Sequence, residues 1–234
     1  MTGAGDARAP EVPGGGRPVP RLRAALGRFH AARPWDHNAH YHRAVLRRLP
    51  RRFGAALDVG CGSGDLARLL ARRAEAVTGI DADPGIVAKA RATTPDTVPV
   101  VFATADALDE QAAPGPYAVL TCVAVLHHLP LAEALASFRA RLAPGGTLVV
   151  AGLHREETLA DRAVSLLAVV AHALVAGWKH RGGGQTSRPP AMTTRTRPAT
   201  RGLAEIRRTA RTVLPGARVR RRLFWRYVLE WKRP

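Results

Sequence analysis

The sequence predicts an α/β fold with a doubly wound, mostly parallel sheet and helices on both of its faces. In residues 56–64 (Ala-Leu-Asp-Val-Gly-Cys-Gly-Ser-Gly), an apolar run ends in three alternate glycines, Gly60, Gly62 and Gly64. This pattern is typical of a buried parallel strand that enters a tight turn. The next segment, 65–73, has leucines at helical spacing. Strand-like and helix-like segments then alternate, which favours parallel strands joined by right-handed crossovers.

The alternation covers the middle of the chain. We expect strands at 55–60, 77–81, 98–103, 117–123 and 146–152, with helices at 65–73, 84–92 and 131–142. A turn at Pro144-Gly145-Gly146 separates the last helix from the last strand. Before the first strand, residues 37–49 place Tyr41, Val45 and Leu49 on one side of a helix, which Pro50 ends.

The C-terminal third is less regular. Its residue pattern predicts an apolar helix at 161–178, a loop at 180–200, a helix at 202–213 and two strands at 219–224 and 227–231. The continuous apolar run of that first helix, 164–176, is shorter than the roughly 20 residues that cross a bilayer. We therefore expect it to cover the core or a substrate; a helix that lies in a membrane interface is the alternative.

The glycine spacing narrows the class of ligand. A dinucleotide fingerprint is G-x-G-x-x-G, whereas this chain has G-x-G-x-G followed by Asp65, which is unfavourable beside a phosphate. Asp81 ends the next strand, where a carboxylate accepts hydrogen bonds from ribose hydroxyls. Asp106 follows the third strand, in a position to accept from an adenine amine.

Four ordered segments carry a family resemblance over residues 53–153. After the glycine turn come Gly79-Ile-Asp-Ala-Asp-Pro84, Thr104-Ala-Asp-Ala-Leu108, Tyr117 to Leu129 and Leu142 to Val150. In these segments the chain resembles the class I S-adenosylmethionine-dependent methyltransferases of small-molecule type. The resemblance implies S-adenosylmethionine as cofactor and a seven-stranded sheet that a C-terminal antiparallel hairpin completes.

The resemblance also implies roles for individual residues. Asp58 and the glycine backbone would hold the methionine portion, Asp81 the ribose, Asp106 with Ala107 the adenine, and the Cys122–Val123 backbone the amino group. The implied cofactor-binding residues are Asp58, Gly60, Cys61, Gly62, Asp81, Ala82, Asp106, Ala107 and Val123. For Asp58 and Asp83, a turn or helix-capping role is the alternative.

Histidines supply the candidate catalytic groups. A base is needed only for a weakly acidic acceptor, and histidine is suited to that role near neutral pH. His127 and His128 follow the fourth strand, and we expect His128 to line the acceptor pocket; capping of the next helix is the alternative. Tyr41, on the covering helix, either contacts the substrate or packs on the first strand. His37, His40 and His42 are weaker candidates, and no spacing supports a metal site.

We expect three parts in the chain. Residues 1–20 form a disordered tail because they are rich in Gly and Pro and carry no apolar core segment. Residues 21–52 form helices that cover the cofactor, and residues 53–234 form the Rossmann-like domain, with 155–200 as a substrate-covering insertion. The two cysteines, Cys61 and Cys122, imply no disulfide framework, which fits the cytoplasm.

The net charge of +18 is unevenly distributed. Residues 1–50 carry +6, residues 51–154 carry −1 and residues 155–234 carry +13. Only three of the 36 basic residues are lysines, a bias that a GC-rich coding sequence produces without a partner. Nucleic acid is therefore a possible partner that we do not favour, although basic surfaces do attract polyanions.

The sequence favours methyl transfer to a small, largely apolar metabolite. The alternatives are a methyltransferase of RNA or another nucleic acid, favoured by the basic flanks, and a non-catalytic S-adenosylmethionine-binding protein. Against the first, the Asn/Asp-Pro-Pro-aromatic motif of base-amine methyltransferases is replaced by Thr121-Cys-Val-Ala-Val-Leu-His, and Cys122 lacks the Pro-Cys context of cytosine C5 enzymes. A nicotinamide oxidoreductase has the wrong glycine spacing. The acceptor, the methylated atom and the oligomeric state stay open.

Overall fold

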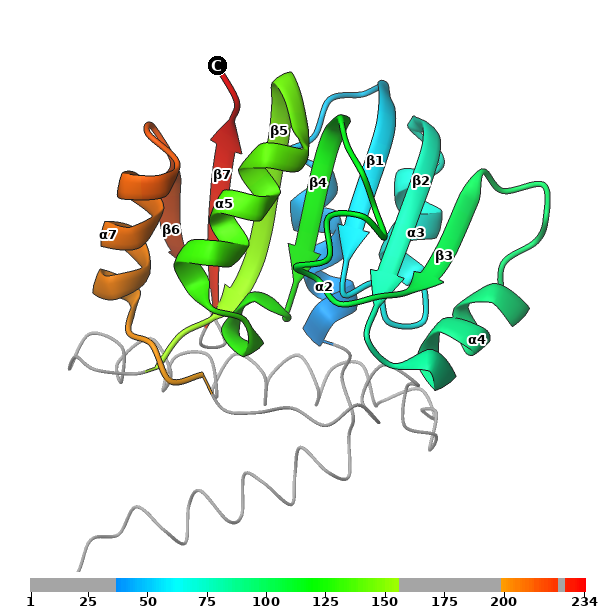
Figure 1. Cartoon of the computed structure of the whole chain (residues 1–234), viewed down its shortest axis with the longest axis horizontal. Helices are drawn as coiled ribbons and strands as arrows, with labels where there is room; N and C mark the ends of the chain where they lie inside the picture. The colour runs from blue at the N-terminus through cyan, green and yellow to red at the C-terminus, as the bar shows by residue number, and fades with distance from the viewer. Residues whose placement is uncertain (1–36, 156–198, 223–225) are drawn as a thin grey trace, which may run out of the picture. The chain divides into compact units, whose positions relative to one another are not determined.

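A computed structural model of the chain describes residues 37–155, 199–222 and 226–234 (Figure 1). The predicted tail at 1–20, residues 21–36 of the covering segment and residues 156–198 of the insertion lie outside the described residues. The predicted apolar helix at 161–178 and nearly all of the loop at 180–200 are therefore outside them as well.

Seven strands form one sheet in the order β3-β2-β1-β4-β5-β7-β6. Their bounds are β1 Phe53–Val59, β2 Ala74–Asp81, β3 Val100–Thr104, β4 Tyr117–Val123, β5 Leu142–Leu153, β6 Arg218–Arg222 and β7 Arg226–Lys232. Strands β1 to β5 pair in parallel, and β7 runs antiparallel to both β5 and β6. The predicted mostly parallel seven-stranded sheet with a C-terminal hairpin is confirmed.

Helices cover both faces of the sheet. Their bounds are α2 His37–Leu46, α3 Asp65–Leu70, α4 Pro84–Ala92, the short 3-10 helix η1 Leu126–His128, α5 Leu131–Arg141 and α7 Leu203–Val213. Helices α5 and α7 share one hydrophobic cluster with the sheet, and α2, α3 and α4 share the other. Figure 1 shows α5 and α7 in front of the sheet and α2 and α3 behind it.

The central strands supply side chains to both clusters. Leu57 of β1 and Val150 of β5 face the α5–α7 cluster, whereas Ala56 and Val149 face the opposite one. All four are fully buried. A strand buried on both faces needs a continuous apolar run rather than alternation, which is why these segments contain so few polar residues.

Strand order reverses between β1 and β4, and this reversal places the functional cleft. Strand β1 pairs with β2 on one side and with β4 on the other, all parallel. The chain leaves the two central strands, β1 and β4, towards opposite faces, so a crevice opens beyond their carboxyl ends.

Some element boundaries differ from the predictions. Helix α3 ends at Leu70 instead of residue 73, and β2 starts at Ala74 instead of residue 77 because it pairs with the beginning of β1. Strand β5 starts at Leu142 and includes the predicted turn. The turn residues form an irregularity there, since the register with β4 shifts between Tyr117 and Val119.

Candidate active site

A cleft of about 490 Å³ lies at the carboxyl ends of the central strands. Ligand-binding pockets commonly have this size. It is lined by His42, Asp58, Gly60, Cys61, Gly62, Ser63, Asp65, Leu66, Ile80, Asp81, Ala82, Ile86, Ala105, Asp106, Ala107, Val123, Ala124, Val125, His128 and Leu129. All nine residues that the sequence nominates for cofactor binding are in this set, so the fold brings them together.

The glycine turn between β1 and α3 forms the floor of the cleft. Gly60 has φ +71°, and a Cβ atom there would lie 2.1 Å from Cγ2 of Val125. Gly62 has φ +52°, and no atom lies within 4 Å of the position that its Cβ would take. Residues with a side chain rarely adopt such φ angles. Gly60 therefore permits close packing against the loop after β4, and Gly62 leaves the space beside its own backbone open.

Arg68 of α3 fastens this turn, a role that the sequence analysis missed. Its guanidinium donates to the Ser63 carbonyl oxygen at 2.9 Å, to Thr94 Oγ1 at 2.9 Å and to Asp65 Oδ1 at 2.6 Å. The turn is thus tied both to the start of α3 and to the segment after α4. An arginine three residues into a predicted helix carries no sequence signal for such a role.

Asp81 connects the end of β2 to the glycine turn. Its Oδ2 accepts from the Gly62 amide at 2.9 Å, and its Oδ1 accepts from the Asp83 amide at 3.1 Å. These bonds fix the plane of the carboxylate at the strand end. Asp83 instead caps α4 by accepting from the amides of Gly85 and Ile86, which confirms the capping alternative for that residue.

Asp106 and Ala107 lie in the loop after β3. Asp106 Oδ1 accepts from the Leu108 amide at 2.8 Å, and the Ala107 carbonyl oxygen accepts from Nη2 of Arg141 at 2.6 Å. Arg141 is buried, and burial lowers the pKa of its guanidinium. The loop is thus held both by its own carboxylate and by a cation from α5.

Asp58 is the most deeply buried acid of the cleft, with 2% of its surface exposed. Its Oδ1 accepts from Thr121 Oγ1 of β4 at 2.7 Å. Burial raises the pKa of Asp58 to about 7; the Thr121 hydrogen bond lowers it, and the charge of Asp81 raises it. Burial disfavours the charged form of a carboxyl group, so the direction is expected.

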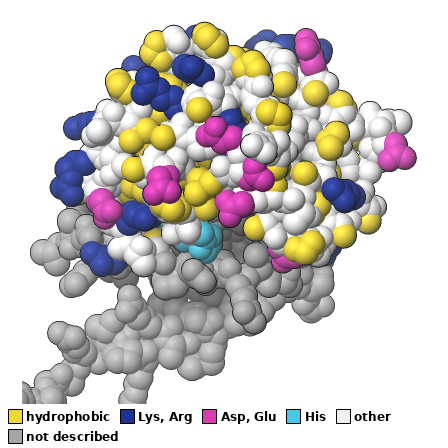
Figure 2. All heavy atoms as spheres, in the orientation of Figure 1, with side chains coloured by type: hydrophobic (Ala, Val, Ile, Leu, Met, Phe, Trp, Pro, Cys, Tyr) yellow, Lys and Arg dark blue, Asp and Glu magenta, His cyan; other side chains and the backbone are white. Residues whose placement is uncertain are grey.

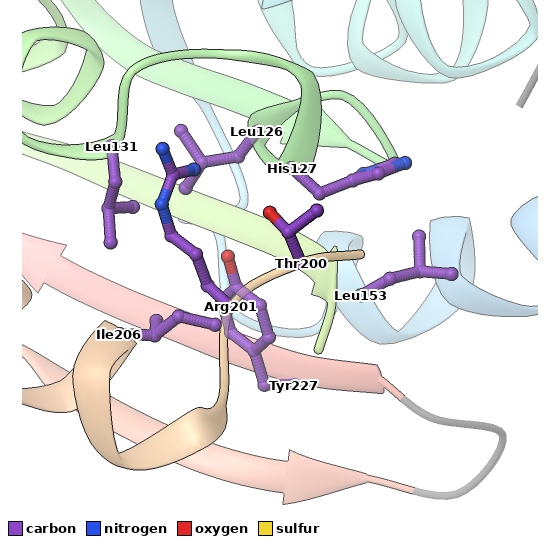
Figure 3. Close-up of a pocket in the computed structure, with 8 residues that line it drawn as sticks. All are labelled: Leu126, His127, Leu131, Leu153, Thr200, Arg201, Ile206 and Tyr227. Carbon is purple, nitrogen blue, oxygen red and sulfur yellow. The ribbon is translucent and has the colours of Figure 1, made fainter. Parts of the chain in front are cut away.

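The two neighbouring histidines line different cavities. His128 is exposed and lines the main cleft. His127 lines a second cavity of about 10 Å³, together with Arg201, Tyr227 and other residues drawn in Figure 3. Such a cavity holds about one water molecule. The ring centroids of the two histidines are 3.9 Å apart and the ring planes are tilted by 40°, so the two side chains are in contact.

Tyr41 lies in the core rather than on the cleft. It is 4% exposed, and the Arg226 guanidinium carbon lies 5.0 Å from the centre of its ring. Burial raises the pKa of its hydroxyl. The next residue, His42, lines the cleft instead. Adjacent helical residues point in directions about 100° apart, so Tyr41 faces the core while His42 faces the cleft. The burial of Tyr41 agrees with the packing alternative, and the helix ends at Leu46 instead of residue 49.

The backbone is strained at Ala124, which follows β4 on the cleft wall. Its φ angle is +59°, a value that a non-glycine residue adopts at an energetic cost.

Cys122 is fully buried, and burial raises the pKa of its thiol to about 12. A thiol that stays protonated is a poor nucleophile, which agrees with a packing role for Cys122.

Within residues 37–155, 199–222 and 226–234, no group of three or more His, Cys, Asp or Glu side chains could hold a metal ion. In the same parts of the chain, no helix is long and apolar enough to cross a membrane.

Comparison with known proteins identifies the family. A family model described as a methyltransferase domain matches residues 56–146. An uncharacterized methyltransferase from Mycobacterium tuberculosis is 30% identical over 205 residues, which cover 86% of this chain and 98% of the relative. The chain belongs to the class I S-adenosylmethionine-dependent methyltransferases.

Other similarities agree with this assignment. A ubiquinone biosynthesis O-methyltransferase from Xanthomonas campestris is 36% identical to this chain over 129 residues, which cover 53% of each of the two proteins. Among solved structures, the N-methyltransferase NodS from Bradyrhizobium japonicum with S-adenosyl-L-homocysteine has a TM-score of 0.56 at 19% identity, covering 90% of this chain and 97% of NodS. Magnesium protoporphyrin IX methyltransferase from Synechocystis, also with bound S-adenosyl-L-homocysteine, has a TM-score of 0.52 at 16% identity and covers 94% and 90%.

S-Adenosylmethionine is the cofactor of this methyltransferase, and the donor set of the cleft fits it. The charged residues among the described lining are all acids: Asp58, Asp65, Asp81 and Asp106. Carboxylates suit hydroxyls, an amine and an ammonium group, whereas a pyrophosphate would be repelled by them. The family assignment sets aside the nicotinamide oxidoreductase alternative.

Proposed function

We propose that this methyltransferase transfers the methyl group of S-adenosylmethionine to a small, largely apolar metabolite. The observation that carries the proposal is the lining of the cleft: Leu66, Ile86, Val125 and Leu129 add apolar surface, and no Lys or Arg is among its described lining residues. A polyanionic acceptor finds no counter-charge there. The similarity to ubiquinone biosynthesis O-methyltransferases supports a small acceptor, while the fold is shared with an N-methyltransferase, so the methylated atom stays open.

The charge distribution supports the same choice. Residues 51–154, which contain most of the cleft, have a net charge of −1. Figure 2 shows both signs of charge spread among apolar side chains on the face in view. Nucleic-acid binding depends on many phosphate contacts from Lys and Arg. A nucleic-acid substrate would therefore have to be held by the basic flanks alone.

We assign the cofactor contacts as follows. Asp81 with Ala82 holds the ribose, Asp106 with Ala107 holds the adenine, and the remaining five residues surround the methionine portion: Asp58, Gly60, Cys61, Gly62 and Val123. The shared cleft and the fixed carboxylates of Asp81 and Asp106 support this assignment.

The residues of the cleft would then position the acceptor and exclude water. When bound, S-adenosylmethionine supplies a methyl group that its sulfonium already activates for in-line displacement. The protein contributes mainly orientation and desolvation of the attacking atom. For a hydroxyl acceptor, His128 would take the proton that the acceptor oxygen loses as the new carbon–oxygen bond forms. The tilted ring of His127, whose centroid lies 3.9 Å from that of His128, would hold the ring of His128 in place.

Three parts of the proposal rest on the sequence. The covering role of residues 21–52 and the substrate-covering role of residues 155–200 remain proposals, as does the cytoplasmic location. Two free cysteines among the described residues fit a reducing compartment.

An acceptor screen tests the function. The purified chain is incubated with S-adenosylmethionine and, separately, with phenols and quinols that carry apolar tails, with small amines, and with total RNA; S-adenosylhomocysteine formation and the mass of the product are measured. We expect turnover with at least one small apolar acceptor. Methylation of RNA with none of the small molecules would overturn the proposal in favour of a nucleic-acid substrate.

A further inference from the structure

Thr121 is a buried polar residue that the predicted active site does not use. It lies on β4 directly beside Asp58 of β1, because the two residues are paired in the parallel register of these strands. Thr121 is fully buried and Asp58 is 2% exposed. The Thr121 hydroxyl donates to Asp58 Oδ1 at 2.7 Å. A threonine in a central strand is ordinary in sequence terms, yet here its hydroxyl meets the one buried acid among the described residues of the cleft.

The hydrogen bond from Thr121 occupies one carboxylate oxygen of Asp58 and leaves the other for a different partner. Asp58 lines the cleft, and among the described residues no hydrogen bond reaches its second oxygen, Oδ2. A buried carboxylate is stable in its charged form only with hydrogen bonds or a counter-charge. Thr121 supplies one hydrogen bond from the protein, and a cationic ligand in the cleft would supply the counter-charge.

We propose that Thr121 is a positioning residue for the cofactor: its hydroxyl holds the Asp58 carboxylate oriented and charged so that it can bind the ammonium group of the methionine portion. This inference rests on the proposed placement of that portion beside Asp58. Thr121 itself acts only through Asp58.

The same geometry makes cofactor binding depend on pH. The pKa of Asp58 is raised to about 7 by burial, and the Thr121 hydrogen bond opposes that rise. Removing the hydroxyl therefore raises the pKa of Asp58 further, and the charged carboxylate forms only at higher pH. Other titratable groups line the same cleft: Asp81 of β2, Cys61 of the glycine turn, His42 of α2, Asp65 of α3, Asp106 after β3 and His128 of η1. Cys122 of β4 is fully buried and lies near enough to Asp58 for their charges to interact.

The test is the affinity for S-adenosylhomocysteine, measured by calorimetry between pH 5.5 and 8.5 on the full chain. We expect Thr121→Val, which has nearly the same shape without the hydroxyl, to bind about tenfold more weakly at pH 7, equivalent to about 1.4 kcal/mol. The pH at which affinity is half lost should rise by about one unit. Thr121→Ser keeps the hydroxyl and should keep the wild-type profile.

Two controls isolate the ammonium contact. 5′-Methylthioadenosine has the adenosine and the thioether but no ammonium group, so Thr121→Val should bind it as the wild type does. Asp58→Asn should remove most of the pH dependence, because the titrating group is gone while His42 and His128 remain. If Thr121→Val does not fold, as judged by circular dichroism, Thr121→Ala takes its place.

The outcomes separate the two proposals. If the wild type binds no S-adenosylhomocysteine, or binds it equally well after Asp81→Ala, the placement of the cofactor fails. If the wild type binds normally but Thr121→Val keeps the wild-type profile, or loses affinity for both ligands equally, Thr121 has only a packing role and this inference is overturned.

Discussion

The three strand-end carboxylates of the cleft are held in different ways, and the difference suits them to different partners. Asp81 accepts from two backbone amides and Asp106 from one, so both are fixed by local backbone. Asp58 is fixed by a side chain from a neighbouring strand and is buried. Carboxylates fixed by local backbone suit neutral hydroxyls and amines, whereas a buried carboxylate is stabilised most by a cation.

Asp81→Ala should weaken S-adenosylhomocysteine binding by about 1–3 kcal/mol, because it removes a charged acceptor from two buried ribose hydroxyls. Calorimetry measures the change. Asp96→Ala is the matched control, since Asp96 is an exposed acid away from the cleft. Unchanged affinity in Asp81→Ala would refute the ribose assignment.

His128→Ala should reduce turnover far more than cofactor affinity, by about 10²–10⁴-fold if the acceptor loses its proton in the transition state. Steady-state kinetics with the acceptor found in the screen, beside calorimetry with S-adenosylhomocysteine, gives both quantities. His127→Ala should have a smaller effect on turnover because His127 lines the other cavity. Equal losses of turnover and affinity in His128→Ala would point to a structural role instead.

At the scale of elements, helix α4 shows how a local signal sets the position of a strand end. Asp83 caps the helix by accepting from the amides of Gly85 at 2.8 Å and Ile86 at 3.3 Å, and Pro84 occupies the first turn. The same loop presents Asp81, whose Oδ1 accepts from the Asp83 amide. A hydrogen bond therefore joins Asp83, the helix cap, to Asp81, the candidate for ribose binding.

Asp83→Ala should destabilise the protein by about 1 kcal/mol, the usual value of an aspartate cap. Urea denaturation at pH 7 measures the loss of free energy of unfolding. Asp83→Asn, which can still accept from the helix amides, should lose much less. A loss in Asp83→Asn as large as that in Asp83→Ala would mean that charge, and not capping geometry, carries the effect.

The same elements show what the sequence can predict. Apolar runs and glycines identified the central strands and the turn because those patterns follow from burial on both faces and from positive φ angles. The ends of α3 and β2 were displaced because strand pairing with Phe53, a tertiary contact, decides where β2 begins. Thr121 was missed since its partner Asp58 is distant in sequence, and the role of Arg68 was missed since it depends on the fold of the glycine turn and on Thr94, 26 residues away. The choice between Tyr41 and His42 needs the rotation of a helix on the sheet.

At the scale of the whole molecule, Asp58, the acid that we propose binds the cofactor, is a cost to folding. The pKa of Asp58 is about 7 in the folded protein against an ordinary value of 3.8. Since the folded state holds the proton more tightly, the contribution of Asp58 to stability is fully present below pH 4. It is lost as pH rises through about 7, where the folded protein must ionise a buried carboxyl.

Asp58→Asn should therefore stabilise the cofactor-free protein progressively as pH rises. The neutral amide can still accept from Thr121, and it never ionises. We expect the difference in free energy of unfolding, variant minus wild type, to grow by about 2–3 kcal/mol between pH 5 and pH 8, at 1.36 kcal/mol for each pKa unit. Urea denaturation across that range measures it, with Asp96→Asn as the exposed control, for which the difference should stay constant. Stability and binding would then move in opposite directions at pH 8, because the charge that weakens the free protein is the one that holds the cofactor. A constant difference for Asp58→Asn would mean that this carboxyl ionises in the folded protein as easily as in water, and that the cleft is wetter than its burial implies.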